Sequence, residues 1–167
     1  TGVTTCLKKN GFTNIEIVKE QATPNGDFPT CPYPNPEIRE ALEVGLNVAK
    51  EVGADILIAT DPDCDRVGIA IKQGDDFRLF SGNEVGVLLT DFIAKRKVAM
   101  GIMPKKPVVV KTIVTTDLAN RVADDYGIET RDVLTGFKYI GDQIANLEKD
   151  GEVDRYLMGF EESYGYL

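Results

Sequence analysis

Short runs of hydrophobic residues alternate along the chain with longer segments in which hydrophobic positions recur every three or four residues. The short runs predict strands at 15–18, 55–60, 67–71, 77–80, 108–110, 128–133 and 156–159. The longer segments predict helices at 1–11, 36–53, 81–93, 117–126 and 139–149. Strands that alternate with amphipathic helices are typical of layered α/β structure.

The order of these segments predicts two domains. The alternation restarts near Ser81, after a predicted turn at residues 74–76. We therefore expect two consecutive small α/β domains, residues 1–80 and 81–167, each a mixed sheet covered by helices.

Burial and loops are predicted from the same pattern. The strand at 55–60, with ILIA at its centre, is expected to be buried. Residues 21–36 are rich in Pro, Asn, Asp and Thr, which predicts a structured loop, and residues 95–107 are predicted to be a connection. One face of the helix that starts at Ser81 is expected to carry Val85, Leu88, Leu89, Phe92 and Ile93.

Composition excludes several classes of function. The formal net charge of −8 argues against partners such as nucleic acid or an anionic membrane, which need concentrated positive charge. The 167 residues include no histidine, so a Cys/His zinc site, a Ser-His-Asp triad and a histidine base are excluded. Three scattered cysteines, Cys6, Cys31 and Cys64, suggest reduced thiols and a cytoplasmic protein. We expect no signal peptide, and the 167 residues include no apolar run of membrane-spanning length.

Three aspartates stand at alternate positions directly after the strand at 55–60, in the run DPDCDR at 61–66. Asp61, Asp63 and Asp65 would repel one another unless a positive group joined them. A hard divalent cation satisfies this need, and magnesium is the usual choice where phosphate completes its coordination shell. The run therefore predicts a magnesium site, with Arg66 placed to neutralise the cluster or to reach a phosphate.

The same run admits other interpretations. One is a solvated acidic turn between two strands. A calcium-binding EF-hand fits poorly, because Arg66 and Lys72 occupy the positions that require Gly and Glu. A phosphatase with Asp63 as nucleophile and Asp65 as acid/base fits better, since DCDRV at 63–67 matches an Asp-x-Asp-x-Val pattern after a strand.

Three further polar groups follow predicted strands. Lys111 ends the strand at 108–110, so its ammonium is expected to emerge at the sheet edge, where it would bind phosphate or move a proton. Thr135 and Gly136 lie at a strand-to-helix junction, whose free N–H groups either bind an anion or simply cap the helix. Glu161 and Ser163 lie beside aromatic residues, an arrangement that suits either sugar hydroxyls or an ordinary acidic turn.

Taken together, these segments resemble the α-D-phosphohexomutase family, the phosphoglucomutases and phosphomannomutases. The resemblance rests on TDPDCDRVG at 60–68, SGNEVGVLLTDFI at 81–93, VVVKTIVTT at 108–116, LTGFKYIG at 134–141 and GFEESYGYL at 159–167. The run FPTCPYPNPE at 28–37 also resembles the family's linker before its metal loop. The motifs span essentially the whole chain.

The resemblance implies the second domain and most of the third domain of a four-domain enzyme. It implies Mg²⁺ as the cofactor, sugar monophosphates and bisphosphates as ligands, and the missing first and fourth domains as partners. It assigns the metal to the three aspartates and a phosphate contact to Arg66. It places Lys111, Thr135 and Gly136 along the substrate cleft, and it matches Glu161 and Ser163 to the residues that hold sugar hydroxyls.

The chain also departs from the family pattern. Phe137 and the Tyr164–Gly165 pair stand where some members carry histidines, which leaves the acid/base group unassigned. No Thr-x-Ser-His-Asn-Pro-like nucleophile loop is present, so we expect these residues alone to be inactive. A non-catalytic sugar-phosphate-binding module is therefore a further alternative. The ending EESYGYL is closer to the phosphoglucomutase and phosphopentomutase side of the family.

Overall fold

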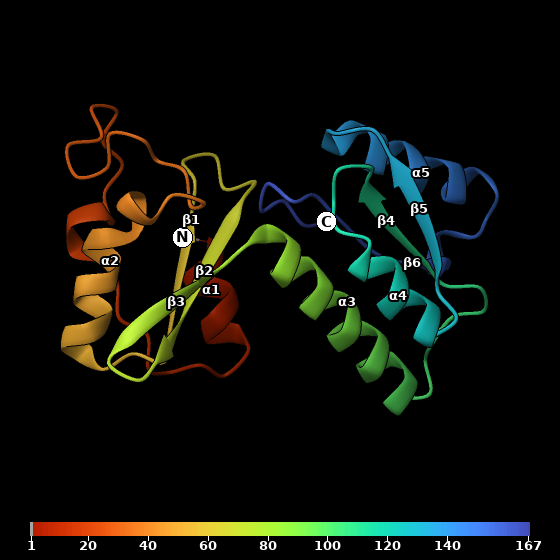
Figure 1. The fold of residues 1–167 in the computed structure, drawn as a ribbon, viewed down its shortest axis with the longest axis horizontal. Helices are drawn as coiled ribbons and strands as arrows, with labels where there is room; N and C mark the ends of the chain where they lie inside the picture. The colour runs from red at the N-terminus through yellow and green to blue at the C-terminus, as the bar shows by residue number, and fades with distance from the viewer. Residues whose placement is uncertain (1) are drawn as a thin grey trace.

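The computed structural model describes residues 2–167 and shows the two consecutive α/β domains that the sequence predicts (Figure 1). The first contains α1 (Gly2–Lys9), α2 (Arg39–Val52), β1 (Ile56–Thr60), β2 (Val67–Gln73) and β3 (Asp76–Phe80). The second contains α3 (Gly82–Ala99), β4 (Val108–Thr112), α4 (Leu118–Asp125), β5 (Glu129–Val133), α5 (Phe137–Lys149) and β6 (Tyr156–Phe160). Two short 3-10 helices, Lys19–Gln21 and Val153–Arg155, complete the elements.

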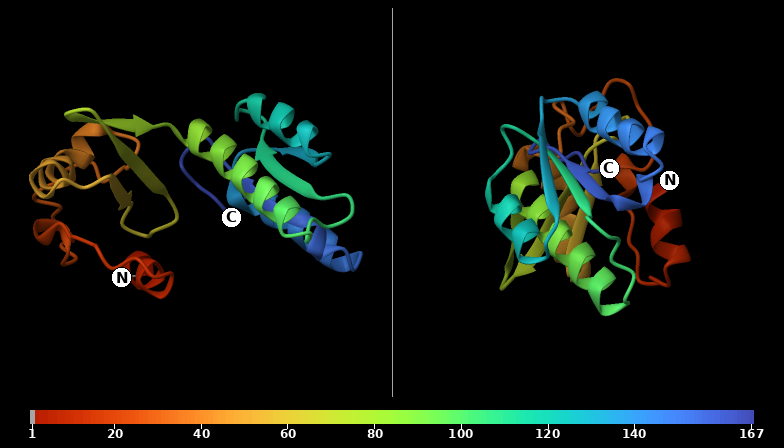
Figure 2. Two further views of the ribbon diagram at one scale, coloured as in Figure 1. Left: turned by 90° about the horizontal axis from the view of Figure 1, so that it is seen from below. Right: turned by 90° about the vertical axis from the view of Figure 1, so that its right-hand side faces the viewer.

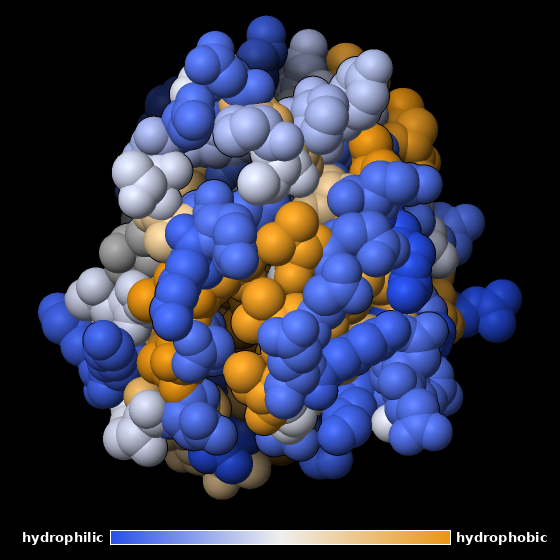
Figure 3. Space-filling model, turned by 90° about the vertical axis from the view of Figure 1, so that its left-hand side faces the viewer, coloured by the Kyte–Doolittle hydropathy of each residue, from blue (hydrophilic) through white to orange (hydrophobic). Residues whose placement is uncertain are grey.

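The first domain is a three-stranded antiparallel sheet in the order β1-β2-β3. Helix α2 packs on it through Leu42, Leu46 and Ala49, which form a core with Ala70 and Phe77. Helix α1 contributes no buried residue. The face of the molecule that the first domain forms shows hydrophobic surface between hydrophilic side chains (Figure 3).

The second domain is a parallel sheet in the order β5-β4-β6, covered on both faces. On one face Val109 packs with Ala94 of α3 and Ala119 of α4. On the other face Val108 and Val110 pack with Ile140 of α5. All five residues of β4 are buried, which makes this strand the centre of the domain. Among residues 2–167, no helix combines the length and apolar character that a bilayer crossing requires.

The sheets differ from the expectation in one respect, because neither of them is mixed. Short connections at 61–66 and 74–75 join neighbouring strands of the first sheet, and connections of that length permit only antiparallel pairing. In the second sheet helices α4 and α5 form the crossovers, which makes neighbouring strands parallel.

Two strand predictions are wrong. Residues 15–18 form no strand, and Ile17 is exposed, because this short segment has no strand beside it to supply ladder hydrogen bonds. The strand at 55–60 exists as β1 but is only partly buried, with Ile56 46% exposed. It lies at an edge of its sheet, and a run of apolar letters cannot show which strand faces will be covered.

Two helices also differ from the prediction. Helix α2 starts at Arg39 rather than at residue 36, because the Asn35 side chain accepts from Glu37 N and holds a turn there. Helix α3 runs on to Ala99, into the predicted connection, and it leaves Leu88 and Phe92 exposed. Its buried residues are Gly82, Val85, Gly86, Thr90 and Ala94. Of the predicted face, Val85 is therefore buried, and Leu89 and Ile93 pack against the core. Gly86 selects the buried face, since a Cβ there would come within 2.0 Å of the Phe160 ring.

Two connections join the domains. Strand β3 runs directly into α3, whose first turn is capped by Ser81, with Glu84 closing a capping box. The end of the chain also returns from β6 toward β2, as the views from two sides show (Figures 1 and 2). There, residues 66 and 165 form an antiparallel bridge. The return therefore brings two predicted site loops together.

Candidate functional site

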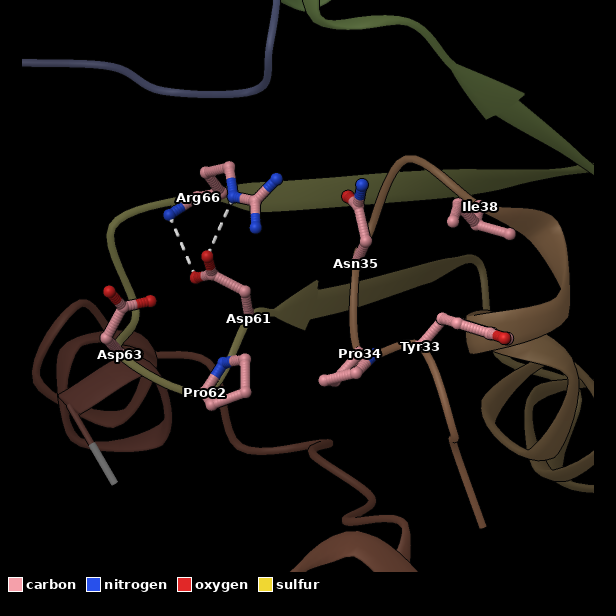
Figure 4. Close-up of a pocket in the computed structure, with 8 residues that line it drawn as sticks. All are labelled: Tyr33, Pro34, Asn35, Ile38, Asp61, Pro62, Asp63 and Arg66. Carbon is pink, nitrogen blue, oxygen red and sulfur yellow. Dashed lines mark hydrogen bonds and ion pairs between the residues drawn. The ribbon is translucent and has the colours of Figure 1, made fainter. Parts of the chain in front are cut away.

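The aspartate loop (residues 61–66) connects β1 to β2 and is held by its own residues (Figure 4). The Asp61 side chain is 2% exposed. Its Oδ1 accepts from the Arg66 backbone N at 3.1 Å, and its Oδ2 accepts from Arg66 Nε at 2.8 Å. Cys64 N donates to the Asp61 carbonyl, and Cys64 adopts a positive φ of 64°, so the loop is a tight turn.

The carboxylates of this loop have different electrostatic surroundings. Burial alone would raise the pKa of Asp61, but hydrogen bonds from the Arg66 side chain and backbone hold that pKa below its ordinary 3.8. The neighbouring Asp61 carboxyl is the largest cause that raises the pKa of Asp65, and Asp63 adds to it. One arginine thus compensates one aspartate well and leaves an excess of negative charge at the other two.

The three carboxylates can reach one cation. Asp61, Asp63 and Asp65 each offer an oxygen, and these oxygens all lie within 4.8 Å of one another. An octahedral Mg²⁺ with bonds of about 2.1 Å separates its ligand oxygens by about 3–4 Å, so small side-chain rotations suffice. A cavity of about 440 Å³ adjoins the loop. Its lining residues are Tyr33, Pro34, Asn35, Ile38, Asp61, Pro62, Asp63 and Arg66 (Figure 4).

The second site loop, which we call the glutamate loop (residues 161–165), follows β6 and turns back on itself. Glu161 N donates to the Gly165 carbonyl at 2.9 Å, and residues 160 and 166 form an antiparallel bridge. The Glu161 carboxylate accepts from Gly136 N at 2.5 Å through one oxygen and from the Ser163 hydroxyl at 3.4 Å through the other. Glu161, Ser163 and Gly136 therefore gather at one place, where α5 begins.

The two loops meet through their backbones. Val67 N donates to the Tyr164 carbonyl at 3.0 Å, next to the bridge between Arg66 and Gly165. A Cβ at Gly165 would come within 2.2 Å of the Phe137 ring, so only glycine permits this approach. The backbones of the two loops are thus held side by side.

Lys111 does not emerge at the sheet edge as predicted. Its side chain is 1% exposed, and its Nζ donates to the Thr115 carbonyl at 3.1 Å and pairs with Asp132 at 3.0 Å. The ammonium lies inside because Thr115 of the β4–α4 turn and Asp132 of β5 supply the oxygens that a buried cation needs. Thr135, by contrast, is exposed beside Gly136.

Sequence reasoning missed the residues that support the glutamate loop. Thr112 and Thr115 are 0% and 3% exposed and contact the Glu162 carboxylate, while Tyr164 is 8% exposed at a positive φ of 68°. No signal in the sequence separates Glu162 from its neighbours, because the three residues lie in a turn and the partners of Glu162 come from a distant part of the chain.

Comparison with known families agrees with this geometry. Residues 2–74 match the model for phosphoglucomutase/phosphomannomutase, alpha/beta/alpha domain II. Residues 81–167 match the model for alpha/beta/alpha domain III of the same family.

Curated relatives of known name match nearly the whole chain. A phosphoglucomutase of Staphylococcus saprophyticus is 43% identical over 99% of this chain and 29% of its own length. A phosphomannomutase of Mycoplasmoides pirum is 39% identical over 96% of this chain and 28% of its own length. The chain therefore spans less than a third of the length of these relatives.

Solved structures show the same fold. A putative phosphomannomutase from Thermus thermophilus is 29% identical, with a TM-score of 0.59 over 80% of this chain and 27% of its own. An N-acetylphosphoglucosamine mutase from Aspergillus fumigatus, in complex with GlcNAc-6P and magnesium, is 21% identical, with a TM-score of 0.50 over 72% of this chain and 26% of its own.

The matches to both family models lie in the order in which the two α/β domains occur in the chain. They confirm the resemblance carried by the five sequence motifs. The chain belongs to the phosphoglucomutase/phosphomannomutase family, of which it carries domains II and III.

Proposed function

We propose that these residues form the middle of a magnesium-dependent phosphohexomutase. The parent enzyme interconverts sugar 1-phosphate and sugar 6-phosphate through a phosphoserine and a bisphosphate intermediate. The observation that carries the proposal is the backbone pairing of Arg66 with Gly165, which sets a carboxylate loop beside a hydroxyl-binding loop. On this proposal the serine nucleophile belongs to a first domain, and a phosphate-binding loop belongs to a fourth domain, both outside these residues.

The aspartate loop fits Mg²⁺ by the chemistry of its donors. Asp63 and Asp65 are exposed, and Asp61 keeps lone pairs free beyond its two bonds to Arg66, since a carboxylate has about four acceptor sites. The ion would offset charge that develops on the transferring phosphoryl group. Arg66 holds Asp61 in place through Nε and presents the rest of its guanidinium group to a phosphate oxygen.

The glutamate loop fits a sugar ring. Glu161 accepts from sugar hydroxyls, and Ser163 both donates and accepts, so the pair recognises hydroxyls of a substrate that binds in two orientations. Gly136 N holds Glu161, while Thr135 lies exposed beside it and lines the same cleft. Lys111 acts from beneath, by fixing the Thr115 carbonyl.

The substrate class follows from the relatives. The phosphoglucomutase at 43% identity and the ending EESYGYL both favour a glucose phosphate, and mannose phosphate is the next candidate. The proposal also places the domain boundary between residues 80 and 81, supported by the family-model ranges. Three free cysteines favour the cytoplasm.

The proposal is tested by assaying the full-length protein that contains these residues with glucose 1-phosphate and Mg²⁺. We expect formation of glucose 6-phosphate, and Asp63→Asn should lower kcat by at least about 100-fold, because a ligand of the charge-stabilising ion is lost. Asp75→Asn, in the exposed β2–β3 turn, is the matched control and should leave kcat unchanged. A wild-type protein without mutase activity on glucose, mannose, pentose or amino-sugar phosphates would refute the proposal.

The phosphatase alternative is separated from the mutase by a different product. A nucleophilic Asp63 would form an aspartyl-phosphate and release inorganic phosphate from this 167-residue chain alone. We expect neither, and we expect a magnesium titration followed by NMR to shift the amide signals of the aspartate loop. Equal responses in wild type and Asp63→Ala would refute the metal assignment.

A further inference from the structure

One carboxylate in the glutamate loop is not used by the proposed function. The Glu162 Oε2 accepts from the Thr112 hydroxyl at 2.9 Å and from the Thr115 hydroxyl at 3.2 Å. The two hydroxyl oxygens are themselves 2.6 Å apart. Glu162 is therefore bound to the turn between β4 and α4, about fifty positions earlier in the chain, and not to its own loop.

The two threonines form a rigid seat. Both are buried, and Thr115 N donates to the Thr112 carbonyl at 3.0 Å, which closes the turn. Beneath it, the Lys111 ammonium fixes the Thr115 carbonyl and is held in turn by Asp132. Thr116 N donates to Asn83 Oδ1, which ties the same turn to the start of α3. A turn held by its own hydrogen bond, by Lys111 and by Asn83 can position a residue that is hydrogen-bonded to it.

The flanking residues have different partners. Glu161 accepts from Gly136 N and from the Ser163 hydroxyl, whereas Glu162 contacts only the threonine seat among the hydrogen bonds of its side chain in the described chain. The Glu162 backbone also rests on Gly82, where a Cβ would come within 2.0 Å of the Glu162 carbonyl oxygen. Fixing Glu162 therefore fixes the direction of both neighbours.

We propose that Glu162 is a positioning residue for the sugar site: seated on Thr112 and Thr115, it orients Glu161 and Ser163 toward the substrate hydroxyls. The inference rests on the proposed function of the glutamate loop. A positioning residue that never touches the sugar contributes equally to the bound substrate and the transition state, so its loss raises KM and leaves kcat nearly unchanged. A residue that serves only stability lowers kcat with the folded fraction and leaves KM alone.

The kinetic test uses Glu162→Ala in the full-length protein. Hydrogen bonds to a carboxylate have energies that correspond to about a tenfold change or more, so we expect KM for the sugar phosphate to rise about tenfold. Thr112→Val with Thr115→Val should give the same rise, and adding Glu162→Ala should then change nothing further. Thr112→Ser with Thr115→Ser keeps both hydroxyls and should restore the wild-type KM. Glu148→Ala, an exposed acid on α5, is the control.

A second measurement separates this inference from the proposed function. In the 167-residue chain, Glu162→Ala should shift and broaden the amide NMR signals of Glu161 and Ser163, whether or not the parent is a mutase. Unchanged signals, or an active variant with an unchanged KM, would overturn the positioning role. An inactive wild type with perturbed signals in the variant would refute the proposed function and retain the positioning of the loop.

Discussion

The aspartate loop is held mainly by its own residues, whereas the glutamate loop, besides the hydrogen bond from Glu161 N to the Gly165 carbonyl, is held by distant parts of the chain. Asp61 and Arg66, which fix the first loop, are five positions apart. The second loop is fixed by Gly136 at its Glu161 side chain, by Thr112 at Glu162, and by Val67 at the Tyr164 carbonyl. These partners come from three different segments of the sequence and from both domains.

This difference decides what each loop depends on. A loop closed by its own ion pair keeps its shape as long as its two flanking strands persist. A loop supported by distant contacts keeps its shape only while the β4–α4 turn, the start of α5 and the start of β2 keep their positions relative to it. We therefore expect the glutamate loop to respond to substitutions far from it, and the aspartate loop to respond mainly to its own.

The largest expected effect is at Gly82. Its Cβ in Gly82→Ala would lie 2.0 Å from the Glu162 carbonyl oxygen and 2.8 Å from Tyr164 N, so the backbone of the glutamate loop must move. We expect a loss of about 2 kcal/mol in the free energy of unfolding, typical of overpacking, and altered amide signals throughout residues 161–165. Urea unfolding and NMR of this chain measure both.

Gly141→Ala is the matched control for that substitution. Gly141 lies inside α5, and nothing lies within 4 Å of its would-be Cβ. Alanine there should stabilise the helix by up to about 1 kcal/mol without changing the loop signals. If Gly82→Ala left residues 161–165 unchanged, the glutamate loop would not depend on distant packing.

The same difference explains what could be predicted from the sequence. Six consecutive letters predicted a polar turn after a strand, and the structure places it between β1 and β2, because the support of this turn is local. The alternation of strands and helices likewise predicted the domains, since helix and strand periods are local properties. The sequence could not predict the exposure of Leu88, the burial of Lys111 or the contact of Glu162 with Thr112, because each depends on which surfaces meet in three dimensions.

A smaller effect is expected at Arg66, and it should stay within the aspartate loop. Arg66→Lys removes the Nε bond to Asp61 but keeps the backbone bond from residue 66. Because about a third of the Arg66 side chain faces water, we expect a loss of only about 1 kcal/mol. Magnesium titration should show weaker binding, since Asp61 loses its support.

Amide signals decide whether that effect is local. Arg66→Lys should shift the signals of residues 61–66 and leave those of 161–165 in place, because the bridge to Gly165 is made by backbone atoms. Arg39→Lys, at an arginine whose side chain is 45% exposed, should shift neither set. Changes that spread to the glutamate loop would show that the two loops are not supported independently.

The smallest effect concerns Tyr156, the first residue of β6, and Tyr166, which follows the glutamate loop, and it appears only in alkali. Burial raises the pKa of Tyr156 to about 12, and its hydroxyl donates to the Leu167 carbonyl. Burial, helped by Tyr164 and Glu37, raises the pKa of Tyr166 well above its ordinary 10, and its hydroxyl donates to the Gly82 carbonyl. An ionised phenol cannot donate, so the fold binds these protons more tightly than the unfolded chain does.

The sign of the pH dependence follows from those two directions. Below about pH 10 both states keep the phenolic protons, and the stabilisation is fully present. As the pH rises from about 10 toward 12, the unfolded chain ionises first, so the folded state loses stability. Tyr166→Phe removes one of the tyrosines whose pKa is raised, so its urea midpoint should fall less between about pH 8 and 10.5 than that of wild type. Tyr33→Phe, at a residue 76% exposed, should fall as much as wild type. Equal slopes in wild type and Tyr166→Phe would mean that the fold does not hold the Tyr166 proton more tightly than the unfolded chain does.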